Sequence, residues 1–302
     1  MQVNNAVIKE LEGHQIVYSQ MEPMKKHTSF KIGGPAEIFI TPDSEEQLLK
    51  TINICRKYEI ERHIIGNGSN LLVSDGGIKG AVIALKNLFG NITLEGSDKN
   101  VISAQAGAAL SQLCKFAQAN CLSGLEFSWG IPGSVGGAIY MNAGAYGGEI
   151  KDVISSIRVL DNEIFTELDA SQAGFGYRKS AFQDSEYIIT AGKFKLEFDE
   201  EKNITDRMKE IAEKRTSKQP LDYPSAGSAF KRPNGNYAAA LIEQCGLKGL
   251  KIGGAQVSEK HSGFIINAEN ATCADVCKLL DKVREIVYKE TGIELEEEVK
   301  RI

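Results

Sequence analysis

The sequence predicts an α+β protein built from more than one domain. Its apolar residues alternate in some segments, as in strands, and recur every three or four positions in others, as in amphipathic helices. A chain of 302 residues with 42% hydrophobic and 25% charged residues is long enough for two or three domains with their own cores. A turn-rich stretch at 221–237 follows a helical segment, so we place a domain boundary near 200–205.

Charge and cysteine usage exclude several classes of function. The 35 basic and 40 acidic residues give a net charge of −5 with no basic run, so we expect no nucleic-acid partner. The start of the chain has no apolar signal segment and no window approaches about 18 apolar residues, so we expect a cytoplasmic protein without membrane insertion. The six cysteines form no CxxC pair, and Cys273 and Cys277 are more typical of helix packing than of metal ligands, so no metal is expected.

The first half of the chain reads as alternating helices and strands. Residues 1–25 are predicted to form a helix or arm, because Val7, Ile8 and Leu11 have helical spacing. A strand at 36–42, apolar at consecutive positions, leads to a helix that begins at Pro42-Asp43 with Asp43 as its cap. A strand at 62–65, strands within 80–106 and a helix around 110–117 follow.

The second half adds more strands and three helices. β-branched residues predict strands at 155–160, 163–168 and 187–198. Helices are expected at 205–218, ended by Pro220, at 239–245, stopped by Gly246, and from a Thr272–Asp275 capping box to Gly292. A strand at 263–267 separates the last two, and alternation predicts a strand at 293–302. The predicted divisions are an arm at 1–25, a first lobe at 26–87, a second lobe at 88–203 and a C-terminal domain at 204–302, whose last strand could return to the second lobe.

Glycine is concentrated between Gly124 and Gly148, which hold 8 of the chain's 30 glycines. Glycine is needed where the backbone takes positive φ or where another group approaches it closely. No Lys or Arg occurs between Lys115 and Lys151, so an anion bound here would be held by backbone N–H groups and hydroxyls such as Ser134. Tight turns packed between two layers explain the same glycines equally well.

A second glycine-rich loop, GNGSNLLVSDGG at 66–77, is also free of cations. It lacks the Lys that a P-loop places after its last glycine, since Ser69 and Asn70 follow Gly68. Neither loop contains GxGxxG, so a Rossmann site is not indicated. Two cation-free loops could together clasp one diphosphate from both sides.

Polar residues with catalytic potential are Arg178 in GYRKS, Ser228 in AGSAF and one of the glutamates at 296–298. Taken alone, each has an ordinary structural interpretation as a paired surface arginine, a turn serine or a solvated acidic face. No GxSxG elbow is present, so a serine hydrolase is excluded.

Seven segments, in chain order, resemble those of the UDP-N-acetylenolpyruvoylglucosamine reductase (MurB) family: TSFKIGGPAEIFITP, IGNGSNLLVSDGG, WGIPGSVGGAIYMNAGAYGGE, FGYRKSAF, AGSAFKRP, LKGLKIGGAQVSEKHSGFIIN and LEEEV. The resemblance runs from about His27 to the C-terminus. It implies a vanillyl-alcohol-oxidase/PCMH-type fold, in which two α/β lobes hold FAD and a C-terminal α/β domain binds substrate.

The resemblance also implies a reaction in peptidoglycan precursor synthesis, and with it a role in cell shape and division. NADPH would be the co-substrate that reduces FAD, and hydride and a proton would then add to the enolpyruvyl group of UDP-N-acetylglucosamine enolpyruvate. Attack on this group places charge on its carboxylate, so the site needs donors there. Partners would be these small molecules alone, with the protein a monomer.

Site residues follow from the same resemblance. Arg178 and Glu298 would stabilise the carboxylate charge, and Ser228 would be the general acid. The cofactor-binding residues would be Gly66, Asn67, Gly68, Ser69, Asn70, Leu71, Pro132, Gly133, Ser134, Gly136, Gly137, Asn142, Gly144, Ala145, Arg178 and Lys300. The substrate-binding residues would be Tyr177, Lys218, Lys231 and Arg232, whose cations complement a diphosphate.

Two departures from the family pattern leave questions open. Lys300 stands where relatives often have arginine and Arg301 follows, so either cation could contact the flavin. The short connection after AGSAFKRP resembles the family's short, type II subclass, so no loop tyrosine is assigned. Two alternative functions are an oxidase of the same flavin fold, acting on a carbohydrate or alcohol, and a non-catalytic protein that binds a nucleotide sugar or flavin.

Overall fold

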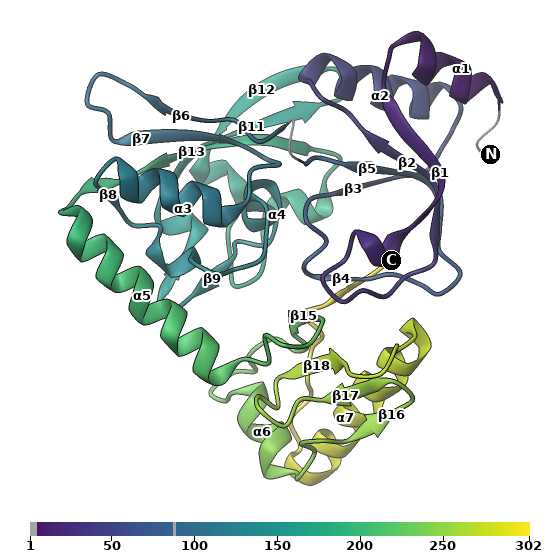
Figure 1. The fold of residues 1–302 in the computed structure, drawn as a ribbon, viewed down its shortest axis with the longest axis vertical. Coiled ribbons are helices and arrows are strands. Elements are labelled where there is room, and N and C mark those ends of the chain that lie inside the picture. Colours follow the sequence, from purple (N-terminus) through teal and green to yellow (C-terminus); the bar gives the residue numbers. More distant parts are fainter. Residues whose placement is uncertain (1–4, 87–88) are drawn as a thin grey trace. The chain divides into compact units, whose positions relative to one another are not determined.

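The computed structural model describes residues 5–86 and 89–302 (Figure 1). The chain forms two compact units, the first from residues 1–20, 38–67 and 80–214 and the second from 21–37, 68–79 and 215–302. Each unit has a hydrophobic core of its own. Residues 1–4 of the predicted arm and 87–88 of the predicted first lobe lie outside the described residues. The predicted boundary after residue 203 falls inside α5 (Glu201–Lys218), and the four-part division stays a prediction.

The largest sheet of the first unit has five antiparallel strands in the order β12-β11-β13-β7-β6. α4 (Val135–Tyr140) packs on β13 and β7 and also contacts α3 (Leu110–Ala119). Gly192 allows α4 to approach the sheet, because a Cβ there would lie 2.7 Å from Cδ1 of Ile139. The predicted strands are confirmed as β6 (Ile92–Glu95), β7 (Val101–Gln105), β11 (Ile154–Asp161), β12 (Ile164–Asp169) and β13 (Ile188–Lys195).

A four-stranded sheet has the order β1-β2-β5-β3, and the division between the two units falls within β1, β2 and β5. Its strands are β1 (Val17–Pro23), β2 (Pro35–Thr41), β5 (Ile78–Ala84) and β3 (Arg62–Ile65). α1 (Asn5–Gly13) packs on α2 (Glu45–Lys57). Two expectations were wrong here. The cap of α2 is Ser44, whose Oγ accepts from the Gln47 N–H at 3.2 Å, rather than Asp43, and the segment predicted as an arm contains β1, a mostly exposed strand without apolar alternation.

Two short strand pairs complete the first unit. β8 (Leu122–Ser123) pairs with β14 (Glu197–Phe198), and β9 (Gly144–Ala145) pairs with β10 (Gly148–Glu149). The β9–β10 hairpin lies inside the glycine-rich stretch that ends at Gly148.

The second unit is a small antiparallel sheet, in the order β15-β18-β17-β16, covered by α7. Its elements are β15 (Ser225–Ser228), α6 (Ala238–Gln244), β16 (Lys251–Ile252), β17 (Ala255–Val257), β18 (Phe264–Asn267) and α7 (Cys273–Thr291). The predicted capping box is confirmed, since Thr272 Oγ1 accepts from the Asp275 N–H at 3.1 Å. Gly292 ends α7 at φ +70°, as glycine at this position predicts.

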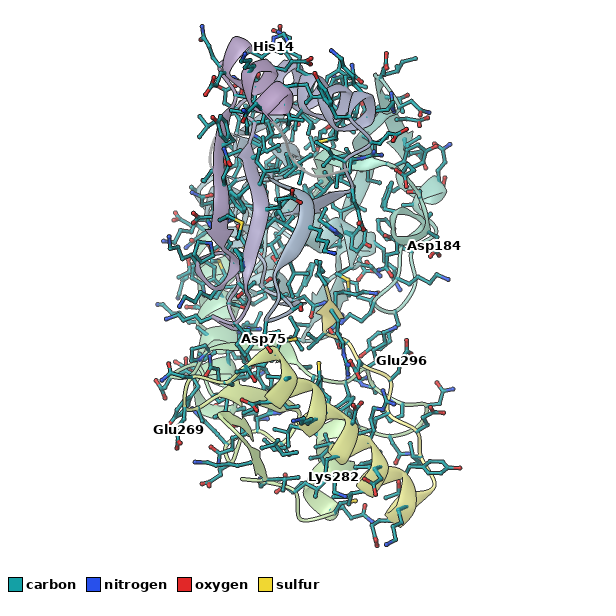
Figure 2. All side chains as sticks on the ribbon, turned by 90° about the vertical axis from the view of Figure 1, so that its right-hand side faces the viewer. His14, Asp75, Asp184, Glu269, Lys282 and Glu296 are labelled. Carbon is teal, nitrogen blue, oxygen red and sulfur yellow. The ribbon has the colours of Figure 1, made fainter. Side chains whose placement is uncertain are left out.

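The N-terminus of α7 is also capped from a distance. Asp75, in the SDGG turn, accepts from the Cys273 N–H at 2.8 Å and from the Ala274 N–H at 3.0 Å. Figure 2 shows Asp75 at this end of the helix. A carboxylate here satisfies N–H groups that have no partner within the helix and offsets its positive end.

The end of the chain differs from the prediction. The expected strand at 293–302 is reduced to β19 (Lys300–Arg301), which runs parallel to β4 (Leu71–Leu72). The Lys300 N–H donates to Asn70 O at 2.9 Å and the Ile302 N–H to Leu72 O at 3.0 Å. The last strand therefore pairs within the segment predicted as the first lobe, not with the second lobe.

A buried carboxylate ties α5 to the segment after β8. Glu126 is 8% exposed, and it accepts from the Gly124 N–H at 2.7 Å and from Arg207 Nη2 at 2.8 Å. Burial by itself raises the pKa of Glu126, but hydrogen bonds from backbone N–H groups, Arg207 and Ser123 outweigh it and leave the pKa below its ordinary value. The folded protein therefore favours the charged form of Glu126.

We expect Glu126→Gln to lower the free energy of unfolding by about 1–3 kcal/mol at pH 7, because charge-assisted bonds become neutral ones. A carboxyl whose folded pKa is lowered contributes stability above its unfolded pKa, and the contribution is lost as pH falls through the folded pKa. The urea midpoints of wild type and variant should therefore differ at pH 7 and converge in acid. The unfolded pKa of Glu lies above pH about 3. If the difference between the two urea midpoints stays constant from pH 7 down to pH about 3, the charge of Glu126 does not have this role.

Candidate functional site

The loop from Gly66 to Leu71 presents open backbone N–H groups. Gly68 has φ +64°, and a Cβ at this position would overlap the carbonyl oxygen of His27. Among residues 5–86 and 89–302, no group accepts a hydrogen bond from the N–H of Asn67, Gly68 or Ser69. Successive N–H groups around a left-handed residue form a concave anion site. The geometry of this loop therefore fits a phosphate, as expected from its lack of cations.

The two glycine-rich loops touch within the first unit. A Cβ on Gly66 would overlap Ser134 Oγ, so only glycine lets the loop lie this close. Ser134 is itself fixed, since its Oγ caps α4 by accepting from the Gly137 N–H at 3.3 Å. The clasp proposed from sequence thus has contact between its two sides.

The backbone N–H groups at the start of α4, which were expected to bind an anion, are instead bonded to other protein groups. The N–H groups of Val135 and Gly136 donate to Ala108 O and Ala106 O, both at 2.9 Å, and that of Gly137 is bound to Ser134 Oγ. A Cβ on Gly136 would lie 2.8 Å from Cβ of Ala106. Here the packing interpretation of the glycines is the correct one, because a neighbouring segment takes the N–H groups that an anion would need.

Arg178 lies on a two-residue turn. The backbone groups of Gly176 and Lys179 bond each other at 2.9 and 3.1 Å, and Arg178 between them has φ +54°. Its Nη2 donates to Gly144 O at 3.0 Å, and its guanidinium lies 5.1 Å from the centre of the Tyr177 ring. The turn therefore holds a predicted catalytic residue against the β9–β10 hairpin.

Asn142, predicted as a cofactor residue, is fully buried and its side chain is occupied by protein groups. Its Nδ2 donates to Glu149 Oε2 at 2.8 Å and to Gly176 O at 2.9 Å, and its Oδ1 accepts from the Lys151 N–H at 3.0 Å. These bonds use both amide hydrogens. The side chain of Asn142 therefore binds the Arg178 turn through Gly176 O.

Within the second unit, the backbone of Glu298 is bonded to the residue that follows Ser228. The Glu298 N–H donates to the carbonyl oxygen of Ala229, the residue after Ser228, at 2.9 Å. A positive φ of +79° at Gly227 and a register shift bend β15 just before Ser228. Across the described chain, no protein group is hydrogen-bonded to Ser228 Oγ. The hydroxyl is therefore available to a bound molecule.

Asn70 links this pair to the loop at 66–71. Its Nδ2 donates to Glu298 O at 3.0 Å, while its carbonyl accepts from Lys300. Ser29, which the sequence reasoning did not single out, adds a second link, because its Oγ lies 2.7 Å from Ser225 O and 3.2 Å from Ser69 O. Only its place in the TSFKIGG segment could have indicated it.

The predicted substrate-binding cations also lie in the second unit. Lys231 forms an ion pair with Glu296, Arg232 stacks 4.5 Å from the centre of the Tyr237 ring, and Lys218 is exposed at the end of α5. Arg301 is held by Glu297 at 2.8 Å and by Asp281 at 3.7 Å. Lys300 has no ion pair among the described residues, so it is the cation better placed to meet a cofactor.

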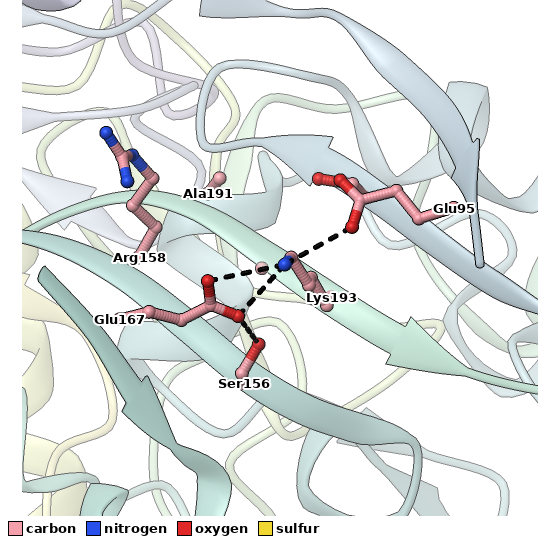
Figure 3. Close-up of a pocket in the computed structure, with 8 residues that line it drawn as sticks. Glu95, Ser156, Arg158, Glu167, Ala191 and Lys193 are labelled. Atoms are coloured by element: carbon pink, nitrogen blue, oxygen red, sulfur yellow. Dashed lines mark hydrogen bonds and ion pairs between the residues drawn. The ribbon is translucent and has the colours of Figure 1, made fainter.

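A hollow on the five-stranded sheet is lined by none of these residues (Figure 3). Lys193 sits there between Glu95 at 3.2 Å and Glu167 at 3.0 Å, and Arg158 is paired with Glu45 at 2.7 Å. Its charges neutralise each other, and no predicted site residue lines it.

Cys273 and Cys277 lie close together on α7. Their Sγ atoms are 3.9 Å apart, and burial together with Cys277 raises the pKa of Cys273 to about 12. Within the described ranges, no three His, Cys, Asp or Glu side chains are arranged to hold a metal ion. The same ranges contain no helix with the length and apolar character needed to cross a membrane.

Comparison with known proteins identifies the family. Residues 219–302 match the UDP-N-acetylenolpyruvoylglucosamine reductase C-terminal domain, and residues 36–163 match an FAD binding domain. A UDP-N-acetylenolpyruvoylglucosamine reductase of Clostridium botulinum is 53% identical over 283 residues, which cover 93% of this chain and 91% of the relative. The chain belongs to the UDP-N-acetylenolpyruvoylglucosamine reductase family. The reductase of Caldanaerobacter subterraneus is 50% identical over 92% of this chain and 91% of its own.

Solved structures agree with this family. The crystal structure of the MurB reductase from Thermus caldophilus matches with a TM-score of 0.81 and 36% identity, over 95% of this chain and 98% of that one. An alkyldihydroxyacetonephosphate synthase, 17% identical, matches with a TM-score of 0.51 over 65% of this chain and 41% of its own, and shares the fold alone. The predicted fold class and FAD as cofactor are confirmed.

Proposed function

We propose that this protein is a cytoplasmic, monomeric reductase that converts UDP-N-acetylglucosamine enolpyruvate to UDP-N-acetylmuramate with NADPH. The reductases to which the chain is similar support this substrate. The observation in the structure that supports the proposal is the hydrogen bond from the Glu298 N–H to the carbonyl oxygen of Ala229, the residue after Ser228, together with the bond from Asn70 Nδ2 to Glu298 O. An oxidase or a passive binder would not need this pair.

The open N–H groups of Asn67, Gly68 and Ser69 fit the pyrophosphate of FAD. The backbone N–H of Lys300 is bonded to Asn70 O in the same loop. Bound FAD supplies the hydride chemistry, accepting hydride from NADPH and delivering it to C3 of the enolpyruvyl group. The remaining cofactor assignments, including Pro132, Gly133, Gly144 and Ala145, rest on family resemblance.

The protein's own residues stabilise the charge on the substrate carboxylate and supply the proton for C2. Hydride addition at C3 places negative charge on the substrate carboxylate, which Arg178 stabilises as a cation with N–H donors. Glu298 is assigned, with Arg178, to the stabilisation of this charge, as the family resemblance implies. Ser228 gives its proton to C2, where the available hydroxyl and its position weigh more than its acidity in water. Tyr177, Lys218, Lys231 and Arg232 bind the UDP portion.

The purified protein is expected to be yellow and to oxidise more than one NADPH per flavin only when the enolpyruvyl substrate is added, with one product formed per NADPH. The test follows absorbance at 340 nm together with product formation, with and without oxygen. Oxygen-dependent NADPH consumption in the absence of substrate would indicate an oxidase. Protein that remains colourless and binds no added FAD would contradict the cofactor assignment.

A further inference from the structure

Arg178 adopts a backbone conformation that arginine seldom takes. Its φ of +54° lies in the left-handed region, which is disfavoured for residues with a Cβ and persists only where surrounding groups impose it. Such strain concentrates at functional sites. The groups that impose it on Arg178 are therefore candidates for a role in the reaction.

Polar side chains anchor the turn to residues 140–144 of the first unit. Gln183, in the 3-10 helix Ala181–Asp184, donates through Nε2 to Arg178 O at 3.1 Å and to Tyr140 O at 3.0 Å. Asn142 donates to Gly176 O at 2.9 Å, and the buried Ser180 donates to Tyr140 O at 2.7 Å. The acceptors around the two amides are carbonyl and carboxylate oxygens, so only their NH₂ groups fit at these positions.

These bonds set where the guanidinium lies. Arg178 Nη2 is bound to Gly144 O, and Gly144 is two residues from Asn142 on the same segment. Asn142 and Gln183 thus fix the backbone of the turn to residues 140–144. Gly144, in the same segment, fixes the end of the Arg178 side chain. If either amide is lost, the turn can relax from its left-handed conformation and carry the charge away from its position.

We propose that Gln183 and Asn142 are positioning residues that act through Arg178 in the reaction with the enolpyruvyl substrate. This inference rests on the proposed function for the role of Arg178. Gln183 is not among the site residues predicted from the sequence. Asn142 was predicted to bind the cofactor, and the structure assigns its side chain to the turn.

The test compares the two half-reactions in FAD-saturated Gln183→Ala by stopped flow. The reaction with the enolpyruvyl substrate should slow by about tenfold to a hundredfold, the scale of a misplaced catalytic group. The reaction of the FAD-saturated variant with NADPH should stay within about twofold, because the substrate charge that Arg178 stabilises forms only in the reaction with the enolpyruvyl substrate. Asp184→Asn is the matched control, since Asp184 is the exposed neighbour of Gln183 (Figure 2) and holds none of these bonds. Equal slowing of both half-reactions would overturn the proposal.

A double-mutant cycle separates positioning from general stability. In an Arg178→Ala background, Gln183→Ala should add less than about twofold, because the group it positions is gone. If Gln183→Ala slows the Arg178→Ala enzyme by as much as it slows the wild type, Gln183 does not act through Arg178. Asn142→Asp is the second variant, with the same expected pattern, since it removes both donors and sets a carboxylate beside Glu149.

A crystal structure of FAD-bound Gln183→Ala supplies a readout that does not depend on activity. We expect residue 178 to leave the left-handed region and its bond to Gly144 O to be lost. An unchanged turn would refute the positioning role even if activity fell. If the wild-type protein fails to use the enolpyruvyl substrate, the proposed function fails, while this structural result still decides whether Gln183 holds Arg178.

Discussion

Ser228→Ala is expected to slow the half-reaction with the enolpyruvyl substrate by about 10²–10³-fold, the usual loss when one positioned donor is removed from an active site. The reason is that the proton for C2 would then have to come from water. The half-reaction with NADPH should change by less than about twofold, because proton delivery to the substrate takes no part in it. Stopped-flow absorbance of the flavin at about 450 nm separates the two.

The control for this prediction is Ser225→Ala on the same strand. Ser225 takes part in the hydrogen bond with Ser29 through its backbone carbonyl, so loss of its hydroxyl should leave both half-reactions close to wild type. Equal loss in the two half-reactions of Ser228→Ala would indicate a folding or binding role instead.

Gly66→Ala is expected to weaken FAD binding by about a hundredfold, which corresponds to about 3 kcal/mol, the upper part of the usual range for overpacking. The added Cβ would overlap Ser134 Oγ, and this hydroxyl cannot easily move because it caps α4. One of the two loops must therefore shift. Titration of the apoprotein with FAD, followed by quenching of flavin fluorescence, measures the change in Kd.

Two further variants test the cause. Gly76→Ala, in the same glycine-rich loop, is the matched control, since its Cβ would meet only Ser74 Oγ at an ordinary 3.6 Å. Ser134→Ala removes the overlapping hydroxyl, so Gly66→Ala should weaken FAD binding less in the Ser134→Ala background than in the wild type. If Gly66→Ala causes the same loss in both backgrounds, the loss does not arise from this overlap.

Local sequence determined most helices and strands of this protein. Apolar periodicity located the buried stripe of α7, and the Thr272–Asp275 box and Gly292 marked its ends, because capping depends on a few adjacent residues. Where local signals compete or are absent, prediction failed. Ser44 rather than Asp43 caps α2, and β1 was missed because it is exposed and does not alternate.

The sequence also contained the identity of the family and its cofactor, in ordered segments that cover most of the chain. It could not distinguish the two kinds of glycine. The glycines of α4 serve packing, since segment 106–109 takes the adjacent N–H groups, whereas Gly68 leaves its neighbours' N–H groups open. That difference depends on which distant backbone lies alongside each loop, and no local pattern records it.

Tertiary structure alone decided how the predicted catalytic residues are held. Glu298 bonds Ala229, the residue after Ser228, only because the last residues of the chain return to pair with β4 and with the segment after β15. Arg178 keeps its left-handed turn only because Asn142 and Gln183 reach it from segments that pack beside it. Residue type and order specify the chemistry that is possible, while contacts between residues far apart in sequence specify where each group stands, because their energies exist only once the chain has folded.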